Sequence, residues 1–515
     1  MTTGAESLRL ILGLRIRGLR QERHWTLKQF SQRCGLSISY LSEIEQGRKY
    51  PKPEKLLALS AGLEIPYDEL VASSGGEGLQ PIESLLRSPL IGGFPFEVFG
   101  VRPEDVVRLL TEAPDRARAL ARAFVDLGRT YDLRLEDVLL SALRSYQEMH
   151  HNYFDDLEEA ASEMRARCGW TGRPAPSGDR LLAALTGEFA ITVDEQRLSA
   201  AGPLAVLRSV YLEGKPARLL VNPRLLPSQR AFVLARELGY RVLHLKERAL
   251  TSSWIAVDSF EQVLNNFKAS YFAGALLLDR QALRGDLETF FARPRFRSAD
   301  LLTLLKGYEV TAELFFHRLS ELVPHFFGLQ QIFFLRLSQG GPRETPRLTK
   351  YLNLSTSSVP HKVGAGEHYC TRWPSLRALD ALFAKAAVGG QSRARPPAVT
   401  IGRSHFVSQD TQFLSFAVAR PLALHPEGAS SVELGFLDDA RLRDVVKFAA
   451  DPSIARDEVG LTCERCPLPR AECADRRSPA VLWRQESDLD AKRRALQELE
   501  GRAVQPPSAR YPALP

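Results

Sequence analysis

Two glycines divide the start of this chain into short segments and restrict what that part can fold into. Thr26 is a suitable N-cap for a first helix, and Gly35 interrupts that helix. Ser37 is a suitable N-cap for a second helix, which ends at Gly47 as its C-cap. A helix, a glycine turn and a second helix form the helix-turn-helix arrangement. The sequence therefore predicts an all-α unit over residues 1–72.

The charge of this segment is asymmetric. Up to Lys55 it contains 11 Lys and Arg residues against 5 Asp and Glu residues, whereas the net charge of all 515 residues is +7. A basic excess concentrated at one end predicts an anionic partner for that end. The stretch from Thr26 to Pro51 closely resembles the XRE, or lambda-repressor-like, family. The resemblance implies that this partner is double-stranded operator DNA.

In a helix-turn-helix unit, the first turns of the second helix meet base edges in the major groove. Glu43 can accept a hydrogen bond from a cytosine amino group, and Ile38 can contact a thymine methyl group. Basic and hydroxyl side chains around them would contact phosphates. The candidate DNA-binding residues are Lys28, Ser37, Ile38, Ser39, Ser42, Glu43, Arg48 and Lys49. For each of them, simple solvent exposure is the alternative interpretation.

A second pattern, from Phe232 to Tyr240, resembles the helix of an ImmA/IrrE-type zinc peptidase that has lost its metal ligands. Such a helix carries two His residues four positions apart, with a Glu between them as general base. Here Arg236 and Tyr240 replace the two His, and Glu237 is retained. Asn266 stands where the third ligand would be a Glu. An Arg cation cannot ligate Zn²⁺, so we expect a peptidase-like frame that is not an enzyme.

Two interpretations of Arg236 and Tyr240 stay open. They can be a salt-bridging Arg and a core aromatic that fill the space of the zinc. Alternatively, they can line a groove that now binds a ligand with an anionic group, since Arg pairs with phosphate bidentately. In that groove Tyr271 would stack on a base, beside an edge strand leading into Asn222 and Pro223. The candidate ligand-binding residues are Arg208, Arg218, Arg230, Arg236, Tyr240 and Tyr271.

Four of the six cysteines form a third pattern. The predicted metal ligands are Cys370, Cys463, Cys466 and Cys473. Two thiolates two residues apart can bind one metal from a single turn, and a third six residues later can close around it. A set of thiolates without His favours a four-iron four-sulfur cluster or structural zinc, and nearby arginines favour the negatively charged cluster; a metal-free site is the third alternative. Cys34 and Cys168 are expected to be inert thiols.

We expect a multidomain α+β protein. Its predicted parts are an all-α helix-turn-helix domain (1–72), a helical linker or oligomerisation region (81–170), a zincin-like pseudo-peptidase domain (180–335), a C-terminal α+β domain with the cysteines (336–485) and a disordered tail (486–515). Residues 135–167 are predicted to form one long helix whose apolar stripe is either core or a dimer contact. Neither a membrane span nor a secretion signal is recognisable, which predicts a cytoplasmic protein.

Together these motifs resemble the short-chain fatty-acyl transcriptional regulators, including the propionate and acetate-metabolism type. The resemblance covers about residues 8–480 and includes the stretches 145–148, 152–154 and 269–273. It implies a homodimer or homotetramer that senses a short-chain acyl-CoA and switches genes of acyl-CoA metabolism, with an iron–sulfur cluster in some members. Two rival hypotheses are an iron–sulfur redox-sensing regulator and a metallopeptidase that acts on a repressor. The lost zinc ligands argue against the second.

Overall fold

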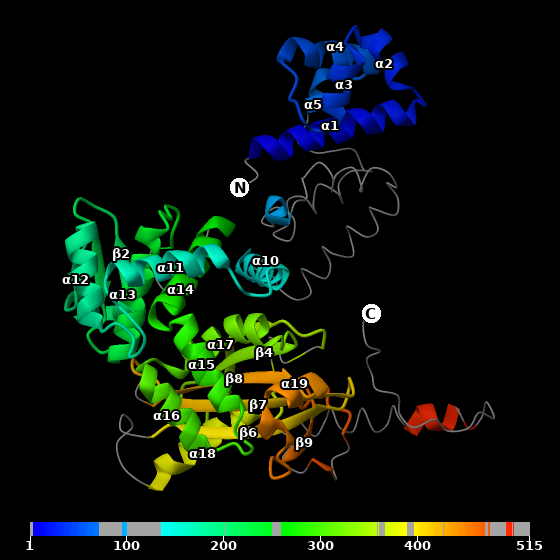
Figure 1. Ribbon diagram of the computed structural model, residues 1–515. Helices are drawn as coiled ribbons and strands as arrows, with labels where there is room; N and C mark the ends of the chain where they lie inside the picture. Colours follow the sequence, from blue (N-terminus) through cyan, green and yellow to red (C-terminus); the bar gives the residue numbers. More distant parts are fainter. Residues whose placement is uncertain are drawn as a thin grey trace. The chain divides into compact units, whose positions relative to one another are not determined.

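The computed structural model describes residues 4–71, 95–99, 135–200, 202–249, 259–357, 359, 366–388, 396–425, 427–468, 472–473, 491–496 and 498 (Figure 1). The chain divides into two compact units. One contains residues 1–146 and 256–264, and the other contains residues 147–255 and 265–515. Much of the predicted linker region, 81–170, lies outside the described residues. No helix in the described part of the chain is long and apolar enough to cross a membrane.

The N-terminal head consists of five helices. They are α1 (Gly4–Glu22), α2 (Leu27–Cys34), α3 (Ile38–Glu45), α4 (Pro53–Leu63) and α5 (Tyr67–Val71). Thr26 accepts a hydrogen bond from the Gln29 amide and Ser37 accepts one from the Tyr40 amide, so both predicted N-caps are confirmed. Gly35 adopts a left-handed conformation with φ of 65°, which glycine tolerates best. The caps at Thr26 and Ser37 and the turn at Gly35 therefore set the ends of the two helices, as predicted from the sequence.

The predicted long helix over residues 135–167 is in fact two helices. α10 (Leu135–Met149) and α11 (Asp155–Arg167) are separated by a short turn. Within that turn His151 and Asn152 have φ values of 49° and 53°, which no α-helix can contain. The one-helix prediction was wrong because periodicity alone does not report a turn between two helical stretches.

The peptidase-like part combines a small sheet with several helices. Its elements are α12 (Gly178–Phe189), β1 (Thr192–Asp194), β2 (Ser209–Leu212), β3 (Arg218–Val221), α13 (Pro227–Val242) and α14 (Phe260–Leu277), with short 3-10 helices at Arg197–Ala200 and Gly202–Val206. The strand order is β1-β3-β2, so β3 is the central strand. The sequence-based expectation of a free edge at this strand is therefore wrong. α15 (Arg280–Phe291), α16 (Ser298–Tyr308) and α17 (Ala312–Phe327) follow.

The C-terminal part is built on a six-stranded sheet of order β5-β4-β8-β7-β6-β9. Its elements are β4 (Ile332–Gln339), β5 (Arg347–Asn353), α18 (Pro374–Val388), β6 (Ala398–Phe406), β7 (Thr411–Pro421), β8 (Ala429–Leu437), α19 (Ala440–Val445) and β9 (Arg456–Val459), with a 3-10 helix at Lys447–Ala450. Neighbouring strands are antiparallel except for β6 and β9. β4 spans the predicted boundary at residue 335. Residues 491–496, within the tail predicted to be disordered, are helical.

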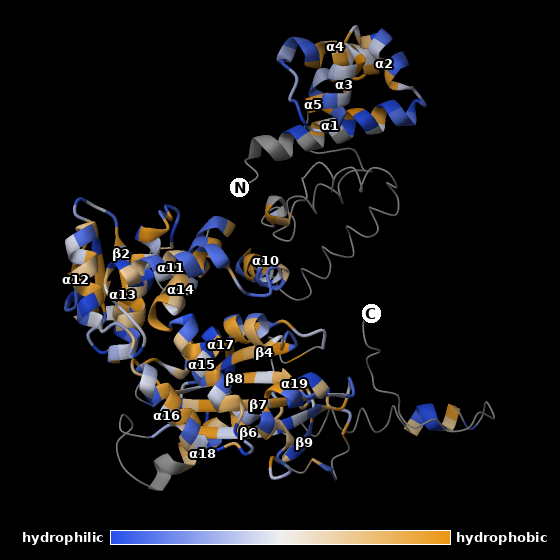
Figure 2. Ribbon diagram, in the orientation of Figure 1, coloured by the Kyte–Doolittle hydropathy of each residue, from blue (hydrophilic) through white to orange (hydrophobic). Residues whose placement is uncertain are grey.

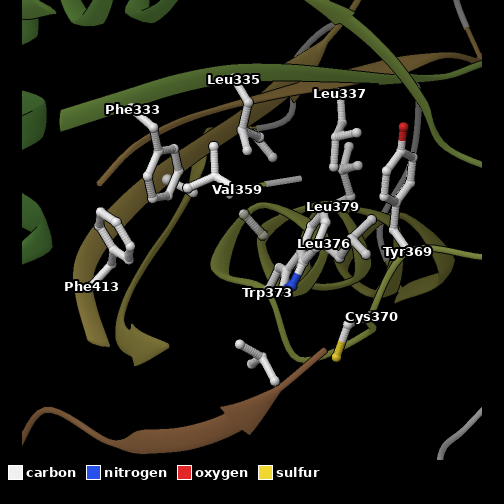
Figure 3. Close-up of a cluster of buried hydrophobic side chains, with 14 of the residues drawn as sticks. Phe333, Leu335, Leu337, Val359, Tyr369, Cys370, Trp373, Leu376, Leu379 and Phe413 are labelled. Atoms are coloured by element: carbon white, nitrogen blue, oxygen red, sulfur yellow. The ribbon is translucent and has the colours of Figure 1, made fainter. Parts of the chain in front are cut away.

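Helices cover both faces of this sheet. Along β4, Phe333 and Leu335 pack with Trp373 in the core on the α18 side (Figure 3). The intervening residue Phe334 lies on the other face, where its ring is 5.6 Å from the ring of His317 in α17. Hydrophobic residues run along β4 and β7 (Figure 2). Burial on both faces explains why these strands read as apolar runs in the sequence.

Candidate functional site

The eight predicted DNA-binding residues all lie on the surface of the head. Ile38 stands in the first turn of α3 with 46% of its surface exposed. The Lys49 ammonium lies 3.4 Å from the Glu43 carboxylate and 4.9 Å from the ring centre of Tyr40. Ser42 accepts a hydrogen bond from Gln46 at 2.9 Å. The exposed side of α3 thus combines an apolar contact with acidic, basic and hydroxyl groups.

A buried ion pair holds this helix against α1. The Arg20 guanidinium bonds both carboxylate oxygens of Glu45 at 2.6 and 2.9 Å and also donates to the Trp25 carbonyl at 2.6 Å. A side chain at Gly13 of α1 would collide with the backbone of Ile44, so the two helices approach closely there. The sequence reasoning did not single out Arg20 or Glu45, because neither faces the predicted DNA surface.

The three positions that replace zinc ligands meet in space. The Tyr240 hydroxyl lies 3.4 Å from the side-chain oxygen of Asn266. Gly239 makes this possible, because a side chain there would press against the backbone of Ala269 in α14. Arg236 donates to the Ser209 hydroxyl at 3.3 Å, and burial lowers the pKa of its guanidinium. The peptidase geometry is retained, and its ligand positions carry none of the two His and one Glu that bind zinc in such a frame.

The carboxylate of the retained Glu237 is held in ion pairs with two arginines. Arg248 donates to both of its carboxylate oxygens, at 2.9 and 2.7 Å, and Arg241 approaches at 3.2 Å. The Arg248 guanidinium also lies between two aromatic rings, 3.7 Å from the ring centre of Tyr211 and 3.9 Å from that of Tyr240. Sequence reasoning missed Arg248 because it lies beyond the helix that carries the motif.

The six predicted ligand-binding residues do not form one group. Arg230 pairs with Glu195 at 2.5 Å and Asp179 at 2.9 Å, and Arg218 is exposed at the start of β3. Arg208 lies within 3.7 Å of Glu313 in α17. Only Arg208, Arg236 and Tyr240 lie near the former zinc site. The last two fit the space-filling interpretation, since both are buried.

The structure corrects the placement of Tyr271. Its side chain is buried, with 1% of its surface exposed, and its hydroxyl donates to Glu158 at 2.8 Å while accepting from the Phe154 amide at 3.3 Å. The ring contacts Phe154 and Phe267 edge to face. Tyr271 is therefore part of the hydrophobic core, and its ring has no exposed face on which the adenine base of a ligand could stack.

Tyr271 belongs to a buried charge network that sequence reasoning missed. Arg318 of α17 bonds both carboxylate oxygens of Glu158, at 2.5 and 2.9 Å, and Glu321 at 2.8 Å. Burial alone would lower the pKa of Arg318, but the two carboxylates outweigh it and raise that pKa. The network ties α11, α14 and α17 together. Asn152, part of a stretch that carried the resemblance, lies close by and donates to Ser320.

The four predicted cysteine ligands are buried, and none of them forms a disulfide. Burial, with the neighbouring thiols of Cys463 and Cys466, raises the pKa of Cys370 to about 12. A β-bridge joins Tyr369 to Thr462, and Arg372 donates to the Glu472 carbonyl beside Cys473. Figure 3 shows the Cys370 sulfur directed away from the hydrophobic cluster.

Thiols alone, drawn from segments that are held together, fit a group bound by thiolates. Within the described residues, however, no three His, Cys, Asp or Glu side chains lie close enough to hold a metal ion. The four-cysteine metal site therefore stays a prediction.

Comparison with known proteins assigns the two domains. A helix-turn-helix family model matches residues 16–70, and an IrrE N-terminal-like domain model, of the peptidase M78 family, matches residues 201–320. The transcriptional regulator ClgR of Mycobacterium tuberculosis is 36% identical over 88 residues, which are 17% of this chain and 78% of that protein. The chain belongs to the helix-turn-helix transcriptional regulators. DNA is accordingly the partner of its head.

Two relatives match this regulator over a longer stretch. The propionyl-CoA carboxylase regulator of Cereibacter sphaeroides is 26% identical over 355 residues, 65% of this chain and 69% of that protein. The regulator PrpR of Mycobacterium tuberculosis is 26% identical over 349 residues, 63% of this chain and 66% of that protein. These matches confirm the resemblance that the motifs indicated.

The regulator is not a peptidase, because its relatives are transcriptional regulators and its M78-like domain has Arg236, Tyr240 and Asn266 at the ligand positions. The multidomain α+β fold class is likewise confirmed.

Proposed function

We propose that a short-chain acyl-CoA controls operator binding by this regulator, and that the genes it switches serve fatty-acyl, propionate or acetate metabolism. One observation carries the proposal: a DNA-binding head and an M78-like domain without its zinc ligands occur in one chain. The name of one longer relative, a propionyl-CoA carboxylase regulator, suggests the ligand class.

The physical basis is a shift between populations. A homodimer or homotetramer holds its heads at more than one spacing, and operator DNA fits one spacing best. An effector that binds one arrangement more tightly shifts the population toward that arrangement. The size of the shift is limited by the difference between its affinities for the two arrangements. Reuse of a lost catalytic frame fits this scheme, because the peptidase-like frame is retained while its ligand positions carry Arg236, Tyr240 and Asn266.

The test uses the full chain and a duplex found by mapping bound sites upstream of neighbouring genes. Operator affinity is measured by fluorescence anisotropy with propionyl-CoA, coenzyme A or propionate. We expect propionyl-CoA to change Kd about tenfold, the size of a moderate coupling between two sites, and propionate to have no effect. Equal affinities in all three conditions would refute acyl-CoA control.

A second candidate, redox sensing, rests on the four buried thiols. If a four-iron four-sulfur cluster is present, its cysteines would be Cys370, Cys463, Cys466 and Cys473, and structural zinc is the alternative occupant of the same thiolates. Operator affinity compared for anaerobic and air-exposed protein, each with and without propionyl-CoA, separates the two switches. A response to air alone would favour redox sensing over acyl-CoA control.

A further inference from the structure

A cluster of cations surrounds one buried carboxylate in the second unit. Glu313 stands in the first turn of α17, and Lys350 lies 2.7 Å from it, Arg336 3.2 Å and Arg208 3.7 Å. Burial alone would raise the pKa of Glu313, but these three cations outweigh it and hold the pKa well below its usual range. Glu313 is therefore an anion throughout the neutral range.

The register of the sheet adds a fourth cation. Arg336 of β4 pairs directly with Lys350 of β5, so both side chains lie on one face of the sheet. On the other side Arg336 pairs with Val432 of β8, which pairs with Val418 of β7. Arg420 lies two residues beyond Val418 and thus on the same face. This is the face that α17 and Glu313 cover.

The charges in this cluster do not balance. Four cations share Glu313, and within the described part of the chain the side chain of Arg420 makes no hydrogen bond or ion pair, although its backbone belongs to the β7–β8 ladder. Burial, together with the charges of Arg208 and Arg336, lowers the pKa of Arg420 to about 10 despite the opposing effect of Glu313. The buried Nε of Arg336 is near Glu313 but lacks a hydrogen bond of suitable geometry. Unpaired buried cations are costly, and an additional anion would relieve that cost.

The cations of the cluster differ in exposure. Lys350 has 49% of its side chain exposed, Arg208 has 32% and Arg336 has 11%. A ligand can therefore reach Lys350 and Arg208 from solvent. Arginine binds phosphate oxygens through two parallel hydrogen bonds, which lysine cannot do.

We propose that Arg208, Arg336, Lys350 and Arg420 form a binding site for a small molecule that carries a phosphate or diphosphate group. The surplus of three positive charges favours a multiply charged phosphate over a single carboxylate. Only the identity of the natural ligand rests on the proposed function: in an acyl-CoA-responsive regulator, the phosphates of coenzyme A would occupy this site. The former zinc site at Arg236 and Tyr240 is then not the phosphate site.

The experiment measures binding to the full chain by calorimetry with three probes. These are propionyl-CoA, inorganic pyrophosphate, and propionyl-pantetheine, which keeps the acyl thioester but has no phosphate. Wild type should bind the first two, and propionyl-pantetheine should bind at least about tenfold more weakly than propionyl-CoA. Arg420→Gln and Lys350→Gln should each weaken pyrophosphate binding about tenfold, as expected for one charge-assisted hydrogen bond. The exposed Arg284→Gln in the same unit is the matched control and should leave pyrophosphate binding unchanged.

Glu313→Gln should change pyrophosphate affinity in the opposite direction from Arg420→Gln and Lys350→Gln. It removes the competing carboxylate, so pyrophosphate should bind more tightly and raise the melting temperature by more than it does in wild type. A merely structural role for the cluster would not produce a larger ligand shift. Lys350→Gln, at a half-exposed position, keeps the test valid if Arg420→Gln fails to fold.

The outcomes separate the two proposals. If pyrophosphate binding is lost in the variants but propionyl-CoA leaves wild-type operator affinity unchanged, the phosphate site stands and acyl-CoA control fails. If propionyl-CoA alters operator affinity equally in wild type, Arg420→Gln and Lys350→Gln, acyl-CoA control stands and this site is wrong. Wild type that binds neither propionyl-CoA nor pyrophosphate also overturns the site.

Discussion

Arg248 holds both carboxylate oxygens of Glu237, with nitrogen–oxygen distances of 2.9 and 2.7 Å. In a peptidase of this frame, the same carboxylate would activate a zinc-bound water. Here it is a structural anion that anchors the segment after α13. In this domain the zinc ligands are replaced, and the carboxylate of the former general base is held by Arg248 in a structural ion pair.

Arg248→Ala should lower the free energy of unfolding by about 3 kcal/mol, because it leaves Glu237 with Arg241 as its remaining ion-pair partner. The urea unfolding midpoint measures the change, with the exposed Arg218→Ala as the control. The double variant Glu237→Ala/Arg248→Ala should be less destabilised than Arg248→Ala alone, since it strands no charge. A single variant as stable as the control would show that the pair contributes little.

DNA binding by the head should be strongly dependent on salt, because its basic residues displace counterions. Lys49→Ala should weaken binding to all sequences alike and reduce the slope of log K against log salt by about 1. Glu43→Ala should instead relax specificity at one base pair by about 1–3 kcal/mol. Anisotropy titrations at several salt concentrations measure both, with Arg284→Ala in the second unit as control. Loss of specificity in Lys49→Ala but not in Glu43→Ala would reverse these roles.

Glu433 should make the stability of the second unit dependent on pH. It is buried on β8, and burial raises its pKa despite hydrogen bonds from the Ser375 amide and the Ser415 hydroxyl. A carboxyl group with a raised folded-state pKa stabilises fully below its unfolded pKa, and this contribution is lost as pH rises through the folded pKa. Glu433→Gln cannot ionise, so the melting temperature of this variant should rise relative to that of wild type as the pH increases above about 4, the ordinary pKa of a glutamate. The exposed Glu427→Gln controls for net charge, and a constant difference across pH would contradict the prediction.

Protein purified anaerobically should be brown if the cysteines hold an iron–sulfur cluster. Single Cys→Ser changes at Cys370, Cys463, Cys466 or Cys473 should abolish the colour. Cys34→Ser and Cys168→Ser should keep it, since the Cys34 thiol donates to the Phe30 carbonyl within the head. Visible absorbance and iron content measure the result. Colourless protein with one equivalent of zinc would favour a structural metal.

Local signals in the sequence predicted local structure well. Thr26, Gly35 and Ser37 marked the ends of the head helices, because caps act through neighbouring residues. The apolar runs of β4, β7 and β8 marked buried strands. The positions of Arg236, Tyr240 and Asn266 in the sequence also predicted that these residues lie close together, because the helices of the domain bring the ligand positions to one place.

Partners distant in the chain could not be predicted in this way. Glu313 meets Lys350 and Arg336 only through the register of the sheet, and no spacing in the sequence encodes that register. Tyr271 was assigned to a ligand because an aromatic residue near a groove is compatible with both roles, and only its burial decides. Arg420, whose side chain has no hydrogen bond or ion pair among the described residues, carries no motif at all.

The pair of Glu158 and Arg318 constrains how this protein can diverge. The two residues are 160 positions apart and both are buried. Replacing Arg318 first strands the Glu158 carboxylate in the interior, whereas replacing Glu158 first leaves Arg318 with Glu321 as its partner. Descendants should therefore lose Arg318 only together with Glu158 or after it. Chains that carry an uncharged residue at position 318 should carry an uncharged one at position 158, and this order of loss would trace the ancestry of the three-helix junction independently of any effector.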